Sequence, residues 1–441
     1  MDEQTLPYSR VAPRAVERPL LFSIALWLHL SVLGFLCADA LHAILLGVAT
    51  RFDVLVAYVF GAWLIAAVFY LFRRRAVQSH ARYLLAFYAG LISIAILALA
   101  APLVFGGNSV YQPGISRISK PEGLPIHGVQ GASRFSTNQL GFRGSELPAT
   151  KDAYRVITVG GSTTACSCLD DTETWPYLMM DSVNSASGRQ SLWVANAGMD
   201  GMNTANHLNF LTTVPALRTA DMLTFLVGAN DLNAALAFEG RSSDLQIRRA
   251  AARIFPDNNT YPYYRRLGAF KALNRAVSRM FSRVTSHEVR SCEEFAFLAD
   301  ERSRGPFIQL PDLTASLREY ADRILELANL CKATGQRCAF LTQPSIWRDG
   351  LSAQEEARLW LGWVGARENR IGYGRPADLA KAMLAYNNTL LSTCSRYGLE
   401  CYDLASSVPR TEDYFSDDFH FTEKGARQVA QYLASHVRFA R

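Results

Sequence analysis

Three long apolar runs occupy the first quarter of the chain. They extend from Leu20 to about Gly47, from Val54 to about Phe72 and from Leu84 to about Phe105. Each is close to or above the ~20 residues that a helix needs to cross a ~30 Å hydrocarbon core. A cleavable signal peptide does not explain the first run, since its apolar core is only about 7–15 residues long. Buried soluble helices are a weaker alternative, because the second run holds no charged residue.

We therefore expect a cytoplasmic segment, 1–19, followed by three transmembrane helices within 20–106. Basic residues predict their orientation, because Lys and Arg accumulate on the cytoplasmic side. Three arginines precede the first run and four lie between the second and third runs: Arg10, Arg14 and Arg18, and Arg73, Arg74, Arg75 and Arg82. The link between the first two runs carries only Arg51. The chain is thus expected in a bacterial inner membrane, with everything after about residue 107 in the periplasm.

The rest of the chain alternates strand and helix patterns. We assign the Pro- and Gly-rich residues 107–136 to a linker and residues 137–441 to an extracytoplasmic domain. Strands are predicted at Tyr154–Val159, Leu192–Ala197, Met222–Val227, Cys338–Thr342 and Glu400–Leu404, and helices at about 203–217, 316–333, 377–396 and 422–437. Such alternation favours an α/β fold, a flavodoxin-like three-layer α/β/α domain with a mostly parallel five-stranded sheet.

Four short stretches with chemically useful residues follow these strands or precede the last helix. They are "GGSTT" (160–164), "NAGMDG" (196–201), "VGAND" (227–231) and "DDFHF" (417–421). Each alone reads as a glycine turn or a helix cap. In open α/β sheets, however, sites lie at the carboxyl ends of the strands. Together, and in this order, the four stretches predict one site.

The set resembles the SGNH (GDSL-type) hydrolases, whose four blocks supply a Ser, a Gly, an Asn and a D-x-x-H pair. The match covers about residues 137–437 and looks most like the branch with Gly-Gly-Ser-Thr, often led in by a segment like "TNQLGFRG" (137–144). The departure from Gly-Asp-Ser-Leu keeps the nucleophile in place and leaves the substrate class open.

The resemblance implies a catalytic triad of Ser162, His420 and Asp417. A serine hydroxyl is a poor nucleophile until a base within hydrogen-bond reach takes its proton, and His420 is that candidate base. A carboxylate then fixes the imidazole tautomer and stabilises the imidazolium. Asp418 competes for this role, but the family spacing favours Asp417.

The resemblance also assigns an oxyanion hole to the backbone N–H groups of Ser162 and Gly201 and to the side-chain amide of Asn230. Gly198 is the alternative glycine, although the spacing from the preceding Asn favours Gly201. At Gly201 we expect a β-carbon to crowd the backbone beside the oxyanion. No CxxC pair or histidine cluster indicates a metal site, and we expect no cofactor.

An insert at about 235–312 is strongly basic, with eleven Arg or Lys against three acids in 241–290. Within 267–284, basic residues recur every four positions opposite an apolar face, at Lys271, Arg275, Arg279 and Arg283. This pattern predicts an amphipathic helix. Two interpretations stay open: a lid with a solvated charged face, or a contact with anionic lipid or an acidic glycan. The net charge of +6 partly reflects topology and does not indicate nucleic-acid binding.

Seven of the eight cysteines follow the linker, so at least one stays unpaired there. The stretches "CKATGQRC" (331–338) and "CSRYGLEC" (394–401) both read as a helix end, a Gly turn and a strand start. A disulfide across either turn is geometrically possible, and small buried thiols are the alternative.

These features predict a membrane-anchored serine esterase or O-acyltransferase that acts on O-acyl groups of a cell-envelope or exported glycan. We expect the acyl group to be acetyl. A membrane acyl donor or a glycan-assembly protein is an expected partner. The alternative is a non-catalytic subunit of a polysaccharide assembly or export complex, because three spans exceed what an anchor requires. An intact triad argues against that alternative.

Overall fold

The computed structural model describes residues 110–111, 113–114, 116–149, 152–240, 244, 247–248, 292, 294–365 and 370–440. All of them belong to one compact unit of the chain. The three expected membrane spans and the expected basic helix at 267–284 lie outside these residues. Within the described residues, no helix combines the length and the hydropathy needed to cross a bilayer.

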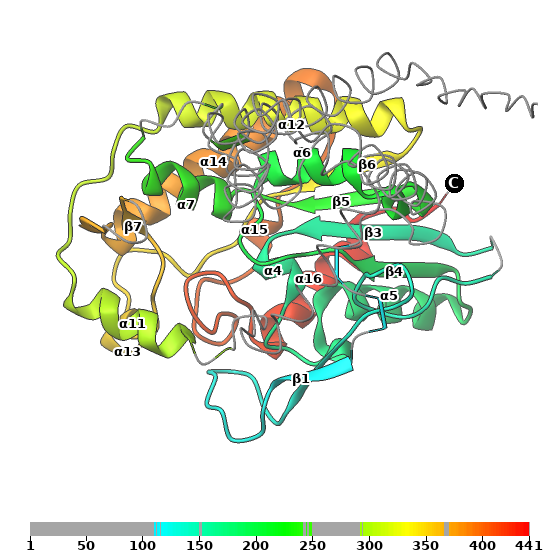
Figure 1. Cartoon of the computed structure of the whole chain (residues 1–441), viewed down its shortest axis with the longest axis horizontal. Helices are drawn as coiled ribbons and strands as arrows, with labels where there is room; N and C mark the ends of the chain where they lie inside the picture. Colours follow the sequence, from blue (N-terminus) through cyan, green and yellow to red (C-terminus); the bar gives the residue numbers. More distant parts are fainter. Residues whose placement is uncertain are drawn as a thin grey trace, which may run out of the picture. The chain divides into compact units, whose positions relative to one another are not determined.

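A five-stranded parallel sheet forms the centre of this unit (Figure 1). The strands in spatial order are β4 (Leu192–Asn196), β3 (Tyr154–Gly160), β5 (Met222–Leu226), β6 (Arg337–Leu341) and β9 (Glu400–Tyr402). All five strands expected from the sequence are confirmed, each within two residues of its predicted bounds.

The central strand shows why these segments become strands. Every residue of β5 is buried, as expected of a parallel strand covered on both faces. Phe225 in this strand stacks on Phe340 of β6, with 5.2 Å between ring centroids. Replacing such a ring by alanine typically costs about 3–5 kcal/mol, because the surrounding core closes the cavity only in part.

Helices cover both faces of the sheet, which confirms the three-layer arrangement (Figure 1). Helices α5 (Trp175–Ser187) and α16 (Glu423–His436) pack against each other on one face. Helices α6 (Thr204–Thr213), α12 (Thr314–Ala333) and α14 (Pro376–Tyr397) lie together on the other. The buried positions of α16 follow one helical face: Ala426, Val429, Ala430 and Leu433.

The strand order explains where a site forms. The first strand of the sheet, β3, has β4 on one side and β5 on the other, so the connections diverge at the carboxyl end of β3. This flavodoxin-like order places a crevice between the ends of β3 and β5. Ser162 follows β3 and Asn230 follows β5, so both residues lie at this edge of the sheet.

Short elements complete the described unit. They are α4 (Ser162–Ala165), η1 (Asp171–Glu173), η2 (Pro215–Thr219), α7 (Ala229–Ala237), α11 (Glu294–Arg304), α13 (Ala353–Glu356), α15 (Leu404–Ser407) and the hairpin of β7 (Trp363–Val364) and β8 (Gly372–Tyr373).

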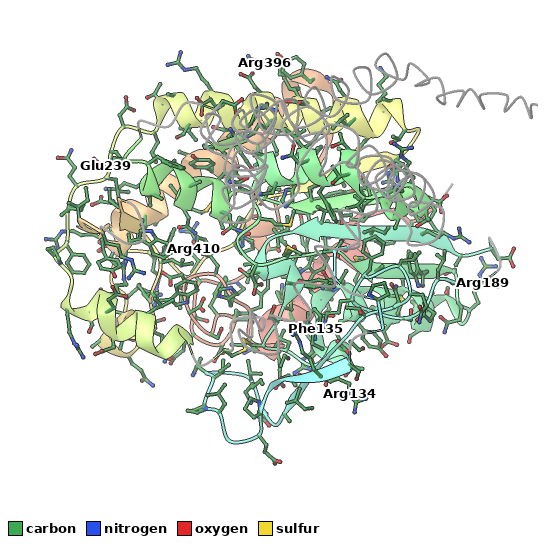
Figure 2. All side chains as sticks on the ribbon, viewed as in Figure 1. Arg134, Phe135, Arg189, Glu239, Arg396 and Arg410 are labelled. Atoms are coloured by element: carbon green, nitrogen blue, oxygen red, sulfur yellow. A yellow bond between two sulfur atoms is a disulfide. The ribbon has the colours of Figure 1, made fainter. Side chains whose placement is uncertain are left out.

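The prediction of a linker over 107–136 is wrong for its described part. Strands β1 (Ser116–Lys120) and β2 (Ser133–Ser136) pair antiparallel, and Phe135 of β2 is fully buried while Arg134 points to solvent (Figure 2). The hydroxyl of Ser133 also donates to the carbonyl of Cys168 at 2.8 Å. The glycines that suggested a linker instead supply left-handed turn residues, with φ of 86° at Gly123 and 57° at Gly131.

Both expected disulfides are present. Cys331–Cys338 joins the end of α12 to β6, and Cys394–Cys401 joins the end of α14 to β9. A third bridge, Cys168–Cys292, was not predicted, because its cysteines are 124 residues apart. Cys166 is the free cysteine among the described residues, and it is buried.

Candidate active site

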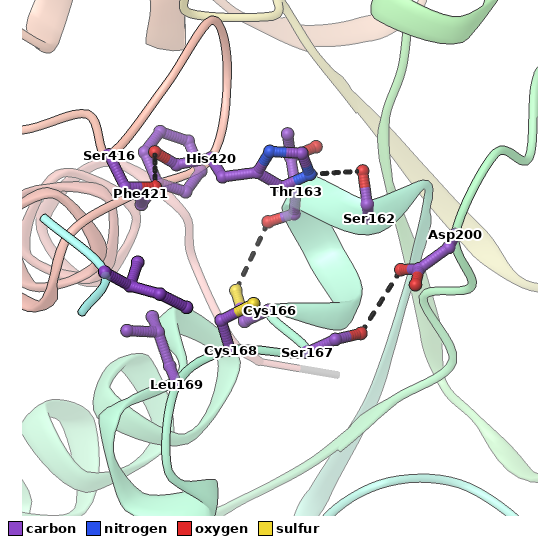
Figure 3. A pocket seen from close by; sticks show the side chains of 11 residues that line it. Ser162, Thr163, Cys166, Ser167, Cys168, Leu169, Asp200, Ser416, His420 and Phe421 are labelled. Carbon is purple, nitrogen blue, oxygen red and sulfur yellow. Dashed lines mark hydrogen bonds between the residues drawn. The ribbon is translucent and has the colours of Figure 1, made fainter. Parts of the chain in front are cut away.

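The three residues expected to form the triad lie in hydrogen-bond contact. His420 Nε2 is 2.8 Å from Ser162 Oγ (Figure 3). His420 Nδ1 is 2.7 Å from Asp417 Oδ2 and 2.9 Å from its Oδ1. The hydroxyl, imidazole and carboxylate are thus connected in the order that base-assisted nucleophilic attack requires.

Two glycines let the chain turn sharply into Ser162. A β-carbon on Gly160 would lie 2.1 Å from Thr164 Oγ1, and one on Gly161 would lie 2.2 Å from Asn230 Nδ2. Larger residues are therefore excluded at both positions. Ser162 is the first residue of α4, where backbone N–H groups have no partner inside the helix.

A tightly bonded loop holds His420. The amide of Ser416 donates to the carbonyl of His420 at 2.8 Å, and the amide of Thr422 donates to that of Tyr414 at 3.1 Å. Thr422 then caps α16 by accepting from Gly425 N at 3.0 Å. The helix entry therefore fixes the backbone on which the imidazole is mounted.

The charges within the triad favour an ionised carboxylate beside a basic imidazole. Burial raises the pKa of Asp417, but the charge of His420 and its hydrogen bonds outweigh this and leave that pKa below 3.8. Burial lowers the pKa of His420, whereas Asp417 raises it more, so the imidazole pKa lies above 6.5. Asp200 and Asp418 raise the His420 pKa further.

The competing carboxylate, Asp418, points away from His420. It accepts from the indole of Trp347 at 2.7 Å and from the backbone amides of Trp360 and Leu361 at 2.7 and 3.0 Å. Burial raises its pKa, against the charge of Arg302. Of the two adjacent carboxylates, only Asp417 contacts the imidazole, as the family spacing implies.

Asn230 lies beside the Ser162 turn, and Asp200, the neighbour of Gly201 in the chain, lines the same pocket as Ser162. Among the described residues, the N–H groups of Ser162 and Gly201 have no protein acceptor. Asn230 Nδ2 donates one hydrogen to the carbonyl of Met202 at 2.9 Å and lies against Gly161. An amide nitrogen carries two hydrogens, so one remains for an oxyanion.

The alternative glycine, Gly198, has a different role. Its N–H donates to Asn196 Oδ1 at 2.9 Å, and its carbonyl accepts from Tyr111 Oη at 2.7 Å. Asn196 in turn donates to Thr164 O at 2.7 Å. Gly198 therefore packs under α4 and has no free donor.

The expectation that a β-carbon at Gly201 crowds the site is wrong. Nothing lies within 4 Å of such an atom, and Gly201 is exposed. Glycine is favoured there because φ is +77°, in the left-handed region. Crowding applies instead at Gly198, where a β-carbon would lie 2.3 Å from Ala165 N.

A small pocket opens beside Ser162 and His420 (Figure 3). Its volume is about 30 Å³, more than the ~10–15 Å³ that a cavity needs to hold one water molecule. The apolar side chains of Ile126, Leu169 and Phe421 line it together with Cys166 and the carboxylate of Asp200. Burial raises the pKa of the Cys166 thiol to about 12, so this neighbour stays protonated and does not compete as a nucleophile.

The sequence did not predict a role for Arg143, the arginine of "TNQLGFRG" (137–144). Arg143 is buried, and its Nε binds Asp171 at 2.7 Å. Its other donors bind four backbone carbonyls, two of them just after the Ser162 turn: Arg134, Ala165, Cys166 and Leu169. All five guanidinium N–H groups are used, so Arg143 fastens the end of α4 to the lead-in segment.

Trp360 is the other functional residue missed. Its indole donates to Asp417 Oδ2 at 2.9 Å, and its ring is parallel to His420 within 5°. No pattern in the sequence marked it, because it lies in an irregular segment far from the four blocks. Among the described residues, no group of three His, Cys, Asp or Glu side chains could hold a metal ion.

No protein-family model and no curated protein matches the chain. Solved structures that match include LAE5, an alpha/beta hydrolase enzyme from the metagenome of Lake Arreo, at 13% identity over 64% of this chain and 95% of that one, with a TM-score of 0.34. Axe2, an acetylxylan esterase from Geobacillus stearothermophilus, matches at 11% identity over 66% and 99%, also at 0.34. A GDSL-like lipase from Bacteroides thetaiotaomicron matches at 10% over 66% and 90%, at 0.32. These likenesses are remote, and the function proposed below rests on the geometry of the site.

Proposed function

We propose that this protein is a serine esterase or O-acyltransferase that uses Ser162 as nucleophile, His420 as general base and Asp417 as the carboxylate that orients the imidazole. The contact of 2.8 Å between Ser162 Oγ and His420 Nε2 carries the proposal. Ser162 Oγ attacks the ester carbonyl, the bond to the alcohol breaks, and the alcohol leaves with the proton that His420 took from Ser162. Water or an acceptor hydroxyl, deprotonated by His420, then attacks the acyl-enzyme and releases Ser162. Hydrolysis and transfer share this intermediate, so both outcomes belong to the proposal.

The acyl group is small, by our proposal acetyl. The pocket beside Ser162 has a volume of about 30 Å³ and an apolar lining from Ile126, Leu169 and Phe421. A short acyl chain fits such a space, whereas a long chain must extend beyond these side chains. One extra methylene in a pocket is typically worth about 10- to 200-fold in specificity.

The acceptor or substrate is, by our proposal, a glycan of the cell envelope, and the catalytic domain faces the periplasm behind a membrane anchor of three spans. The apolar runs within 20–106 support the anchor. The disulfides Cys168–Cys292, Cys331–Cys338 and Cys394–Cys401 support an oxidising compartment. A membrane acyl donor supplies the acetyl group if the reaction is transfer.

The test is turnover of p-nitrophenyl acetate, butyrate and octanoate by the full-length protein in detergent. We expect kcat/KM to fall by about 10-fold or more from acetate to butyrate. Ser162→Ala should lower the acetate rate by about 10³-fold or more. Equal rates for wild type and Ser162→Ala would contradict the proposal and favour the non-catalytic subunit.

A further inference from the structure

We infer that Trp360 is a positioning residue, whose indole N–H holds the Asp417 carboxylate in the orientation that accepts from His420. The inference rests on the function proposed above. It begins with Asp417 Oδ2, which accepts two ring N–H groups at once, from His420 Nδ1 at 2.7 Å and from Trp360 Nε1 at 2.9 Å. Both donors therefore share Oδ2, and His420 Nδ1 also lies 2.9 Å from Oδ1.

The other carboxylate oxygen is fixed by its own backbone. Asp417 Oδ1 accepts from the amides of Phe419 at 3.0 Å and His420 at 2.9 Å. Those two bonds lie within the loop and fix the position of Oδ1. The indole is the donor that reaches Asp417 from a separate segment, and it resists rotation of the carboxylate away from the imidazole.

The two rings also stack on each other. Trp360 and His420 are parallel within 5°, with 5.9 Å between ring centroids. Two parallel rings that donate to the same oxygen restrict the orientation of the carboxylate. A carboxylate that rotates away lengthens its bond to the imidazole, and the imidazole then loses alignment with Ser162.

A second buried carboxylate keeps Trp360 in place. Asp418 accepts from the backbone amides of Trp360 and Leu361. Arg302 donates to the carbonyl of Leu361 and to that of Gly374, and its charge stabilises the Asp418 carboxylate. The two adjacent carboxylates thus have different roles. Asp417 binds the imidazole, and Asp418 anchors the segment that carries Trp360.

The sign of the pH effect follows from the charged groups around His420. Asp417 and Asp418 face it from its own loop, Asp200 from the loop after β4, and Arg302 of α11 acts through Asp418. Removal of the indole N–H changes the charge of none of these four groups. Without the indole N–H the Asp417 carboxylate can rotate away from the imidazole, and the contact that raises the pKa of His420 weakens, so this pKa should fall.

The experiment compares Trp360→Phe with replacement of Trp360 by benzothienylalanine, in which sulfur takes the place of the N–H and the ring shape is kept. Trp363→Phe is the matched control, because Trp363 stacks on Trp360 at 6.3 Å without touching the triad. We expect both Trp360 variants to lower kcat on p-nitrophenyl acetate by about 10- to 100-fold, with KM within about twofold of wild type. The acid limb of kcat/KM should move to lower pH, and the control should match wild type.

The titration of His420, followed by NMR of ring-labelled histidine in the Ser162→Ala background, gives a readout independent of turnover. A fall of the His420 pKa in the benzothienylalanine protein supports the inference even if the ester assay rejects the proposed function. An unchanged or higher His420 pKa in that isosteric protein would overturn it, because the carboxylate would then have kept its contact with the imidazole. So would a loss confined to Trp360→Phe, which would show that ring packing alone is required.

Discussion

Among single residues, Asn230 shows how one side chain serves structure and chemistry together. One amide hydrogen is bound to Met202 O, and the nitrogen lies beside Gly161 and the Ser162 turn. The remaining hydrogen faces no protein acceptor among the described residues. Preorganised donors of this kind act where charge develops in the transition state.

Asn230→Ala is therefore expected to lower kcat on an activated acetyl ester by about 10²–10³-fold, with little change in KM. Steady-state kinetics on the purified variant checks this. The loss must stay smaller than that of Ser162→Ala, because the nucleophile is intact. A change in KM alone would mean that Asn230 binds substrate in the ground state and does not form an oxyanion hole.

The His420–Asp417 contact predicts a pH dependence. The general base acts in its neutral form, and Asp417 holds the His420 pKa above 6.5. Activity should therefore rise with pH along a limb centred above 6.5. In Asp417→Asn the charge that raises this pKa is absent, so the limb should move to lower pH while kcat falls by about 10⁴-fold. If the pH–activity limb of Asp417→Asn lies at the same pH as that of the wild type, His420 is excluded as the titrating base.

At the scale of elements, the two short-range disulfides have the same position in the fold. Each closes a seven-residue separation from a helix end to the next strand, α12 to β6 and α14 to β9. Cys168–Cys292 instead closes a separation of 124 residues and lies beside the pocket. In the chain-entropy description, longer loops gain more from closure.

Cysteine-to-serine double variants test this difference. Removal of the 331–338 bridge should lower the free energy of unfolding by about 2.5 kcal/mol, and removal of the 168–292 bridge by about 5 kcal/mol. Denaturant titration measures both. Peptide mapping without reductant should recover all three bridges, with Cys166 as a free thiol. Finding the cysteines of 331–338 and 394–401 as free thiols would contradict the proposed compartment.

The strands and long helices were predictable because their apolar patterns have the period of their element. β5 is buried at every position, and α16 buries a stripe at helical spacing. The β1–β2 hairpin was missed because its exposed residues and turn glycines resemble a linker. Its stability comes from contacts such as Ser133 with Cys168, which no local pattern records.

The same distinction applies to the site. Ser162, Asn230 and His420 were identifiable because each adjoins a strand end or helix entry in a short block. Trp360 and Arg143 act through contacts made across the fold, with Asp417 and with the carbonyls after α4. Their importance depends on the distance to a partner in space, so spacing along the chain could not reveal it.

For the whole molecule, the proposal places a periplasmic catalytic domain behind three membrane spans. Arginines flanking the apolar runs carry this orientation. A reporter active only in the cytoplasm should be active when fused after Arg75 and silent when fused after Gly107. Silence after Arg75 with activity after Gly107 would reverse the topology and remove the oxidising compartment from the account.

The most direct test of the central claim is covalent labelling of the nucleophile. A fluorophosphonate reacts with a serine only when a base activates it and donors accommodate the tetrahedral phosphorus. We predict that the wild-type protein gains one adduct, which peptide mapping places on Ser162, and that Ser162→Ala gains none. Labelling of another serine, or no labelling of an intact wild-type protein, would contradict the assignment of Ser162 as a catalytic nucleophile.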